Sequence, residues 1–438
     1  MRSPHASAAV VGADSRVASV DVLRGFVIAL MIFVNDLAGA PHAPGWLKHT
    51  DVQADAMTLP DAVFPAFLFI AGMSIPLAFE RALLQGKTRG VLVAKALTRA
   101  AALLMVGVIM VNIEEHNPGW RGAWGAATYL AMFLTFVVVP REPGPARTVL
   151  GAARIVGVLG LTGLVLIYRT GAGERMVLGP WFDPTDTVWL RHWWWGILGL
   201  IGWAYLAASL LYLLLARRRE WLVGATGCLM LVYVAAASDL GGQVGSHEWL
   251  AWSTPTLDQV RAVFAWIDNQ VPIGSGFGSH AAIVMAGCCL GSILSPASDV
   301  RTPGERLRWA RTFAIGLFFA GLFLDAPYGV NKIRATPAWC FYSATLTIGV
   351  WMLLYWVIDI RGWQAWTRWV RPAGANPLLA YLLHPFLYYV AALLAVPLDF
   401  YKHENIPVVL AIAGSLLMAF LVVQLTGWIA RLGFRLKV

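Results

Sequence analysis

The sequence predicts an all-α, polytopic transmembrane helix bundle. Hydrophobic residues make up 58% of the 438 residues and charged residues only 13%, against roughly 25% charged residues in soluble domains. The mean hydropathy is +0.65. A soluble protein this apolar could not cover its own surface with polar groups. The apolar residues also fall into runs of about 20, the length that crosses a bilayer as a helix.

Twelve apolar runs follow one another, which predicts about 10–12 spans in a single integral membrane domain covering residues 1–438. They lie at 22–38, 59–79, 91–111, 123–139, 149–168, 195–216, 221–238, 280–295, 310–327, 338–358, 376–397 and 406–430. We expect residues 1–16 to form a flexible arm. We interpret the first run as a retained span and not as a cleaved signal peptide.

The basic residues predict the orientation of these spans. If the N-terminus lies in the cytoplasm and the spans alternate, 24 of the 33 lysines and arginines fall on the cytoplasmic side. Such enrichment is typical of cytoplasmic segments, so we expect both termini inside and the loop around His49 outside, in the periplasm of a bacterial inner membrane. Because the basic residues cluster between apolar runs, the net charge of +9 does not indicate nucleic-acid binding.

The stretch Val17–Glu80 carries the pattern most typical of a reaction site. His49 lies in the connector between the first two spans, Asn35 and Asp36 close the first span, and Asp61 opens the second. Ionisable groups within a bilayer are costly and usually functional. A carboxylate that holds an imidazole makes a base near neutral pH, and an amide can donate to an oxyanion. These groups suit acyl transfer, whereas a solvated loop histidine is the simpler alternative.

Six segments of the chain match motifs of a known family. They are SVDVLRG (Ser19–Gly25), FVND (Phe33–Asp36), WLKH (Trp46–His49), TLPDAVFPAFLFIAGMSIPLA (Thr58–Ala78), VNKIRATPAWC (Val330–Cys340) and GANPLLAYLLH (Gly374–His384). In combination they resemble the transmembrane acyltransferases related to heparan-α-glucosaminide N-acetyltransferase, and the pattern is closer to a bacterial branch of that family. The resemblance covers both ends of the chain, and little of it extends into the middle, about 120–300.

The resemblance implies an enzyme that takes an acetyl group from cytosolic acetyl-CoA. It delivers the group across the bilayer to an amino or hydroxyl group of a sugar or glycoconjugate. The family's catalytic histidine falls on His49 as general base, its aspartate on Asp61 and its asparagine on Asn35. The segment Thr50–Met57 departs from the family pattern, so we expect it to select the acceptor. Direct transfer and a route through acetyl-His49 both remain open.

We expect coenzyme A to bind at the cytoplasmic mouth, where basic side chains can meet its phosphates. The candidates are Arg24 with Asp21, together with Arg81, Lys95 and Arg99. A helix cap and a topology anchor are the plain alternatives for the first two. The resemblance also places Asn376 and His384 near the coenzyme. They are eight residues apart and share one helix face, which hydrogen bonding between helices would explain equally.

The acceptor is expected to meet Trp46, Asp36, Asn331 and Lys332. Two long outer segments, 169–194 and 239–279, are rich in tryptophan and would form either a sugar platform or an aromatic belt at the membrane surface. GSGFG (Gly274–Gly278) lacks the strand–helix context of a nucleotide loop, and we interpret it as a flexible turn outside the membrane.

Other classes of function remain open. A transporter or flippase for a sugar or lipid-linked substrate would also use polar groups within spans, and a non-catalytic sensor could retain the same fold. No metal site is expected, because His192 and His247 lack partners at ligand spacing. The four cysteines lie in or beside apolar runs and are interpreted as core residues. The partners are the bilayer and a carbohydrate acceptor, and a homodimer is possible.

Overall fold

The computed structural model describes residues 17–114, 118–168, 190, 192, 194–215, 218–237, 271 and 273–437. Within these ranges the chain is all-helical, apart from an isolated bridge that pairs Val137 with Leu436. The longer helices are α1 (Ala18–Leu37), α2 (Leu59–Leu84), α3 (Arg89–Glu114), α4 (Pro118–Thr135), α5 (Pro145–Leu166), α6 (Gly196–Leu215), α7 (Arg219–Ala237), α9 (Ala281–Leu294), α10 (Pro303–Tyr328), α11 (Pro337–Leu354), α13 (Pro377–Leu393) and α14 (Val408–Arg431).

Shorter helical segments connect or extend these helices. They are η1 (Gly45–Leu47), the π-helical η3 (Ile273–His280) before α9, the π-helical η4 (Tyr355–Ile360) after α11, η5 (Ala365–Trp369), α12 (Arg371–Ala375) and η6 (Phe400–Lys402). In the described ranges, ten helices are long and apolar enough to cross a membrane. The predicted fold class is therefore confirmed, and each of the twelve predicted spans overlaps a helix.

The centre of the bundle is a close pair of helices, α2 and α9. Every residue of α9 is buried, and the two backbones touch at glycines. A Cβ on Gly72 would lie 1.9 Å from the carbonyl oxygen of Val284, and one on Gly287 would lie 2.0 Å from that of Phe69. Small residues at such crossings let membrane helices approach closely. The glycines therefore hold α2, which carries Asp61, against the most buried helix.

Helix α1 is fixed in the same way by segments from the end of the chain. A Cβ on Gly25 would lie 2.2 Å from the carbonyl oxygen of Val370, and one on Gly374 would lie 2.1 Å from that of Asp21. At its start, the backbone N–H groups of Ala18 and Ser19 donate to the two carboxylate oxygens of Asp359, each at 3.0 Å. This carboxylate caps two of the N–H groups that a helix start leaves unpaired.

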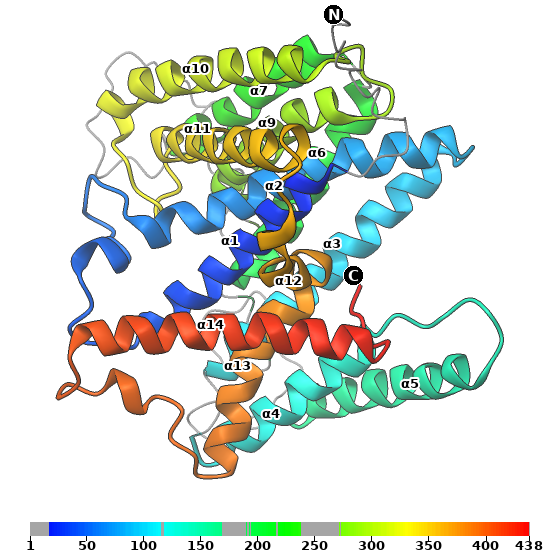
Figure 1. Ribbon diagram of the computed structural model, residues 1–438, viewed down its shortest axis with the longest axis vertical. Helices are drawn as coiled ribbons and strands as arrows, with labels where there is room; N and C mark the ends of the chain where they lie inside the picture. The colour runs from blue at the N-terminus through cyan, green and yellow to red at the C-terminus, as the bar shows by residue number, and fades with distance from the viewer. Residues whose placement is uncertain are drawn as a thin grey trace, which may run out of the picture.

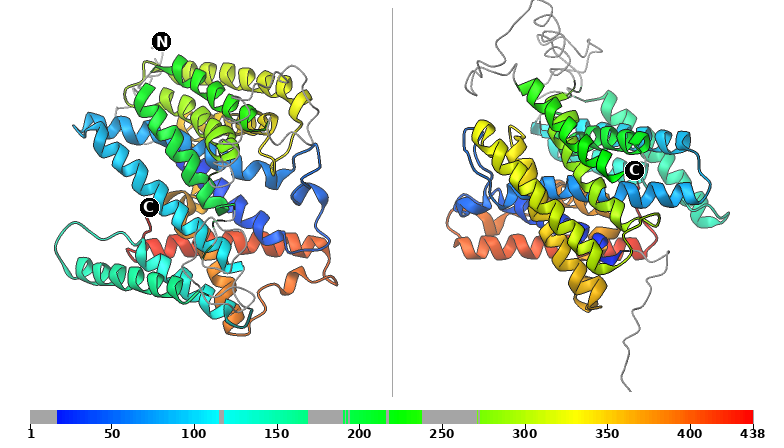
Figure 2. Two further views of the ribbon diagram at one scale, coloured as in Figure 1. Left: turned by 180° about the vertical axis from the view of Figure 1, so that it is seen from behind. Right: turned by 90° about the horizontal axis from the view of Figure 1, so that it is seen from above.

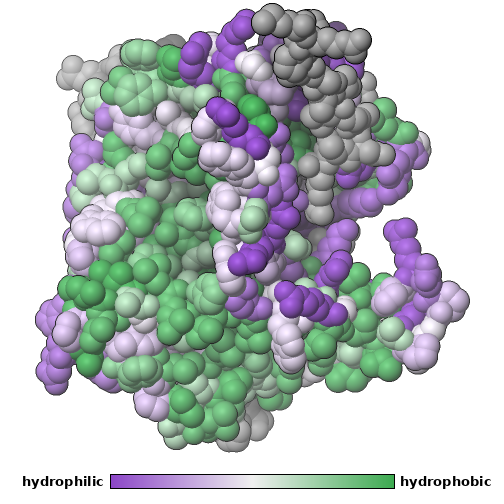
Figure 3. All heavy atoms as spheres, in the orientation of Figure 1, coloured by the Kyte–Doolittle hydropathy of each residue, from purple (hydrophilic) through white to green (hydrophobic). Residues whose placement is uncertain are grey.

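The connections between helices gather at two ends of the molecule (Figure 1). The connector after α1, the α10–α11 connection and the α13–α14 connection lie at the left. The α2–α3 turn, the α4–α5 loop and the end of α14 lie at the right, and Figure 2 shows the same separation from behind. These are the two groups that the charge pattern assigns to opposite faces. Hydrophilic residues gather at the right-hand end, whereas the lower face over α14, α13 and α5 is apolar (Figure 3).

Two interpretations of the sequence are wrong. GSGFG is no outer turn, because it forms most of η3 within the candidate span Ile273–Leu294. Its glycines are buried because α7 packs on them, and a Cβ on Gly278 would lie 2.8 Å from the backbone nitrogen of Tyr233. Cys228 is exposed on α7, although the other three cysteines are buried as expected. The N-terminal arm, His247 and most of the two tryptophan-rich segments lie outside the described residues.

Candidate active site

The start of α2 holds the carboxylate of the candidate site. Thr58 has an extended backbone and precedes a first turn that contains Pro60. Asp61 lies three residues later, and its Oδ2 accepts from the Thr58 backbone N–H at 3.1 Å. TLPD is thus a capping box with aspartate as the reciprocal partner. The Asp61 side chain is almost fully buried, and the positive end of the helix dipole favours its charge.

His49 binds this buried carboxylate directly. Its Nδ1 lies 2.7 Å from Asp61 Oδ1, and its side chain is 41% exposed while that of Asp61 is 1% exposed. Since Asp61 also receives the Thr50 backbone N–H at 3.2 Å, every group around it donates. The ionised carboxylate therefore requires a proton on Nδ1, which leaves the Nε2 lone pair as the basic site of the imidazole. The predicted His49–Asp61 contact is present in the structure.

Lys332 is the third ionisable member of the site. It reaches in from the α10–α11 connection, with Nζ 3.1 Å from His49 Nδ1, 3.4 Å from His49 Nε2 and 4.0 Å from Asp61 Oδ1. Because Nδ1 already donates to Asp61, the ammonium can donate only toward Nε2. Burial lowers the pKa of Lys332, and the Asp61 charge partly opposes this effect. A cation beside a neutral imidazole favours negative charge that develops there.

Asn331 and Trp339 position the connector around the site. The buried Asn331 side chain donates to the carbonyl oxygens of Asp51 (2.9 Å), Val52 (3.2 Å) and Ala54 (2.8 Å). The Trp339 indole donates to the Asp61 carbonyl oxygen at 3.0 Å. The sequence placed Asn331 at the acceptor, but this geometry occupies its amide group with the protein backbone. Lys332, its neighbour, points at the imidazole instead.

A second histidine, which was not predicted from the sequence as a site residue, lies close to these residues. His280 is buried at the end of η3, with its ring 5.3 Å from that of Phe64 and 6.0 Å from that of Trp339. Its Nδ1 has no hydrogen-bond partner within the described part of the chain. A titratable side chain inside an apolar span was the available signal, but the neighbouring glycines suggested an outer turn.

Asp36 and His384 meet in a separate buried cluster. Asp36 Oδ1 accepts from His384 Nε2 at 3.1 Å and from Lys402 Nζ at 3.2 Å, and Oδ2 accepts from the Tyr401 hydroxyl at 2.7 Å. The Tyr388 hydroxyl also donates to this carboxylate. Sequence analysis assigned Asp36 to the acceptor and His384 to the coenzyme, whereas the structure brings them together. The cluster ties α13 and η6 to the end of α1.

Asn35 and Trp46 lie at the surface. Successive helix residues are about 100° apart, so Asn35 is exposed although Asp36 is buried. Within the described ranges the Asn35 side chain makes no hydrogen bond in the protein, and its amide is open to a ligand. Trp46, in η1, is 62% exposed.

The residues predicted to bind coenzyme A fall into two groups. A tied group is hydrogen-bonded within the protein, and an open group is exposed. Arg24 donates to Asp21 (3.0 Å), to the Gly374 carbonyl oxygen (3.3 Å) and to Ser74 Oγ (2.7 Å), so it links α1, α2 and α12. Asn376 Oδ1 accepts from the Leu436 backbone N–H at 3.1 Å.

The open group is basic and lies on exposed helix faces. Arg81, Lys95 and Arg99 are exposed, and Arg99 lies over the Tyr205 ring at 4.7 Å. Lys87, Arg141 and Lys437 lie close enough to Lys95 to repel its charge. Like charges held together in this way suit a polyanion. We call Lys87, Lys95, Arg141 and Lys437 the basic cluster.

The fold and the site define a polytopic membrane protein with a histidine–carboxylate pair of the kind used in acid–base catalysis. Residues 16–115, which include both members of the pair, match the family model described as heparan-alpha-glucosaminide N-acetyltransferase, catalytic. Over this stretch the chain is similar to that family of membrane acetyltransferases, at the level of distant homology. The resemblance predicted from the motifs is thereby confirmed.

Two curated relatives give the extent of this similarity. Heparan-alpha-glucosaminide N-acetyltransferase of Mus musculus is 37% identical over 98 residues, and that of Homo sapiens is 37% identical over 97 residues. Each match covers 22% of this chain and 14% of the relative. The chain thus spans about one seventh of the length of the curated relatives that it matches.

Proposed function

We propose that this protein is a transmembrane acetyltransferase. It moves an acetyl group from acetyl-CoA in the cytoplasm to an amino or hydroxyl group of a sugar or glycoconjugate on the opposite side. The observation that carries the proposal is the 2.7 Å contact between the accessible His49 imidazole and the buried Asp61 carboxylate. Both residues lie inside the stretch that matches the catalytic family.

His49 acts as the general base in this proposal. The acceptor nitrogen or oxygen attacks the thioester carbon, His49 Nε2 takes its proton, and the C–S bond breaks as the tetrahedral intermediate collapses. The imidazolium then returns the proton to the coenzyme A thiolate. Asp61 holds the proton on Nδ1 and stabilises the imidazolium. Lys332, 3.4 Å from Nε2, stabilises the oxyanion of the intermediate, and the open amide of Asn35 is a second candidate for that role.

The donor binds at the far end of α2 in this proposal. Asp61 lies in the first turn of this helix, and Lys87 of the basic cluster follows its last turn. The 26 residues of α2 rise about 39 Å, enough to cross the roughly 30 Å hydrocarbon core. Lys95, crowded by Lys87, Arg141 and Lys437, fits the phosphates of coenzyme A, since an anion relieves the mutual repulsion. Donor and acceptor thus approach from opposite faces.

His49→Ala provides the main test, because the same connector contains a second, exposed histidine, His42. Each variant is reconstituted and given labelled acetyl-CoA with a panel of amino sugars and periplasmic glycans. Acetyl transfer should collapse in His49→Ala and persist in His42→Ala. Thermal stabilisation by coenzyme A should survive in both variants, because the basic cluster is intact. Full transfer activity in His49→Ala would overturn the assignment.

The same stabilisation assay separates the enzyme from other classes. A transporter or flippase for sugars has no reason to bind coenzyme A, so its unfolding temperature would not move when the coenzyme is added. Mass spectrometry after incubation with acetyl-CoA alone then distinguishes the two routes. An acetyl group on His49 supports a covalent intermediate, and an unmodified enzyme that transfers on addition of acceptor supports direct transfer.

A further inference from the structure

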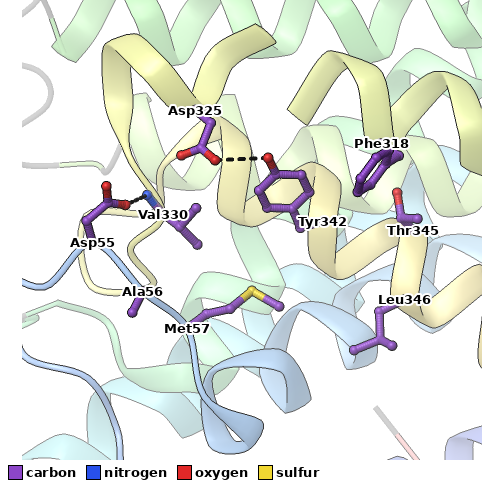
Figure 4. A pocket seen from close by; sticks show the side chains of 9 residues that line it. All are labelled: Asp55, Ala56, Met57, Phe318, Asp325, Val330, Tyr342, Thr345 and Leu346. Atoms are coloured by element: carbon purple, nitrogen blue, oxygen red, sulfur yellow. Dashed lines mark hydrogen bonds between the residues drawn. The ribbon is translucent and has the colours of Figure 1, made fainter. Parts of the chain in front are cut away.

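A groove opens beside the candidate active site, between α10, α11 and the connector that follows His49 (Figure 4). Its volume is about 540 Å³, within the range of sites for small molecules. The side chains that line it are those of Asp55, Ala56, Met57, Phe318, Asp325, Val330, Tyr342, Thr345 and Leu346. The Tyr342 hydroxyl lies against the Asp325 carboxylate, and the Met57 thioether lies below them.

One end of the groove is apolar and lies within the membrane-spanning part of two helices. Phe318 lies seven residues before Asp325 on α10, which is about 10 Å along the helix axis. Leu346 lies nine residues after Pro337, the first residue of α11, or about 14 Å along that axis. Phe318 and Leu346 are 42% and 52% exposed. The groove therefore opens sideways, where a bilayer would supply acyl chains, and reaches roughly half of the 30 Å hydrocarbon core.

The other end of the groove carries two carboxylates. Asp55 Oδ1 accepts from the Val330 backbone N–H at 2.6 Å, and Asp325 Oδ2 accepts from the Tyr342 hydroxyl at 2.9 Å. Gly329 permits the first contact, because its φ is +64° and a Cβ there would lie 2.9 Å from Asp55 Oδ1. Among the residues that the structure describes, no lysine or arginine lines the groove. This end is thus negatively charged and favours a cation.

The same two segments build this charged end and the active site. Asp55 and Met57 lie just before Thr58, whose backbone N–H donates to Asp61. Val330 lies two residues before Lys332, and Lys332 contacts His49. Asn331 lies between them and holds the connector in place. A molecule seated in the groove would therefore have its polar end beside the segments that present the catalytic pair.

We propose that this groove binds the acetyl acceptor as a membrane-anchored amphiphile, with its hydrocarbon chain between α10 and α11 and an amine-bearing, positively charged head at Asp55 and Asp325. The inference rests on the proposed acetyltransferase function and names the acceptor class. A chain buried along Phe318 and Leu346 contributes about 0.8 kcal/mol for each methylene group removed from water, and the two carboxylates select the cationic head. The acceptor would then reach the site from within the bilayer.

Photo-crosslinking tests this proposal on the full-length protein in nanodiscs of phosphatidylcholine. The probes are hexadecylamine with a diazirine in its chain and the matching neutral alcohol, with labelled residues mapped by mass spectrometry. We expect the amine to label α10 and α11 around the groove, with about tenfold weaker binding of the alcohol, the factor that 1.4 kcal/mol represents. Asp55→Asn combined with Asp325→Asn should bring the amine down to the level of the alcohol.

A matched pair of variants on α11 tests the apolar end of the groove. Leu346→Trp fills it, whereas Leu353→Trp adds the same bulk to an exposed position outside the groove lining. Labelling should be lost in the first variant and kept in the second. Equal labelling in both variants, or labelling spread evenly over all exposed helices, would overturn the site. Equal binding of amine and alcohol would overturn the cationic head.

Activity distinguishes failure of this inference from failure of the proposed function. Specific labelling of the groove by an amine, without any acetyl transfer to any amine or sugar, would support the amphiphile site and refute the proposed acetyltransferase function. Acetyl transfer to soluble amino sugars that is unchanged in Leu346→Trp, with no specific labelling, would support the acetyltransferase function and refute the amphiphile site.

Discussion

Asp61→Asn tests the proposed catalytic pair with almost no change in side-chain shape. The Asp61 oxygens face donors: His49 Nδ1 at 2.7 Å, and the backbone N–H groups of Thr50 at 3.2 Å and Thr58 at 3.1 Å. An asparagine has to turn its NH₂ group away from the two backbone donors and toward His49. The ring proton then moves to Nε2, because Nδ1 must accept. Nε2 can no longer take a proton from the acceptor.

The expected loss of activity follows from the wrong tautomer. The corresponding substitution in Ser-His-Asp hydrolases lowers kcat by about 10⁴-fold. We therefore expect a loss of about 10³- to 10⁴-fold, or ~4–5.5 kcal/mol at 1.36 kcal/mol per factor of ten. The free energy of unfolding should change by less than this loss of transition-state stabilisation, because the asparagine oxygen still accepts from Thr50 and Thr58. The exchange of one hydrogen bond to a charged group costs about 1.5–3 kcal/mol.

The assay measures transfer from labelled acetyl-CoA at saturating acceptor, beside thermal unfolding of the same preparation. The rate should fall by the full factor while most of the protein stays folded at the assay temperature. A variant that keeps more than about a tenth of the wild-type rate would refute the reasoning, since one factor of ten is only 1.36 kcal/mol. A rate loss that merely follows the unfolded fraction would refute it as well.

Three further outcomes can be measured. Burial lowers the pKa of Lys332 from its usual 10.5, and the proposed role needs the ammonium form, so activity should begin to fall at a pH below 10.5. Lys332→Arg should move this alkaline loss of activity to higher pH, and a pH profile that does not move would contradict the role. Gly72→Ala should cost ~3 kcal/mol or more and lower the yield of folded protein, because its Cβ would lie 1.9 Å from a backbone oxygen. Gly163→Ala should be neutral, because no atom of the described part of the chain lies within 4 Å of the added Cβ. Asn331→Ala should speed amide hydrogen exchange across 50–57, because it removes three hydrogen bonds to this segment. Ile333→Ala, at an exposed position, should not, and equal exchange in both variants would show that Asn331 does not hold the segment in place.

The elements and the His49–Asp61 contact were predictable because both depend on local information. Apolar runs of about 20 residues mark the spans whatever their packing. Twelve positions separate His49 from Asp61, so both lie on one connector and the start of the helix that follows it. Residues from distant segments were harder to place. Lys332 lies 283 residues from His49, so its polarity indicated a function, but only the packing of α11 against α2 brings it to the imidazole.

Side-chain partners explain the remaining differences. Asn331 was expected at the acceptor because an amide can bind hydroxyl groups, but three backbone oxygens of the connector occupy it. Asp36 and His384 were assigned to opposite substrates, since nothing in their local sequence shows that α13 packs on the end of α1. The glycines of η3 read as a turn because glycine is flexible, whereas contact with α7 gives them a packing role.

The cap of α1 by Asp359 has a consequence for biosynthesis. The N–H groups of Ala18 and Ser19 wait for a carboxylate encoded about 340 residues later. At about 5–20 residues per second, the ribosome needs roughly 17–70 s to make that distance. The His49–Asp61 pair can form soon after α2 is inserted. The Asp359 cap of α1 and the contact between Lys332 and His49 cannot form until most of the chain is made. The nascent protein thus carries the histidine–carboxylate pair without its neighbouring cation, and the proposed site is complete only near the end of translation.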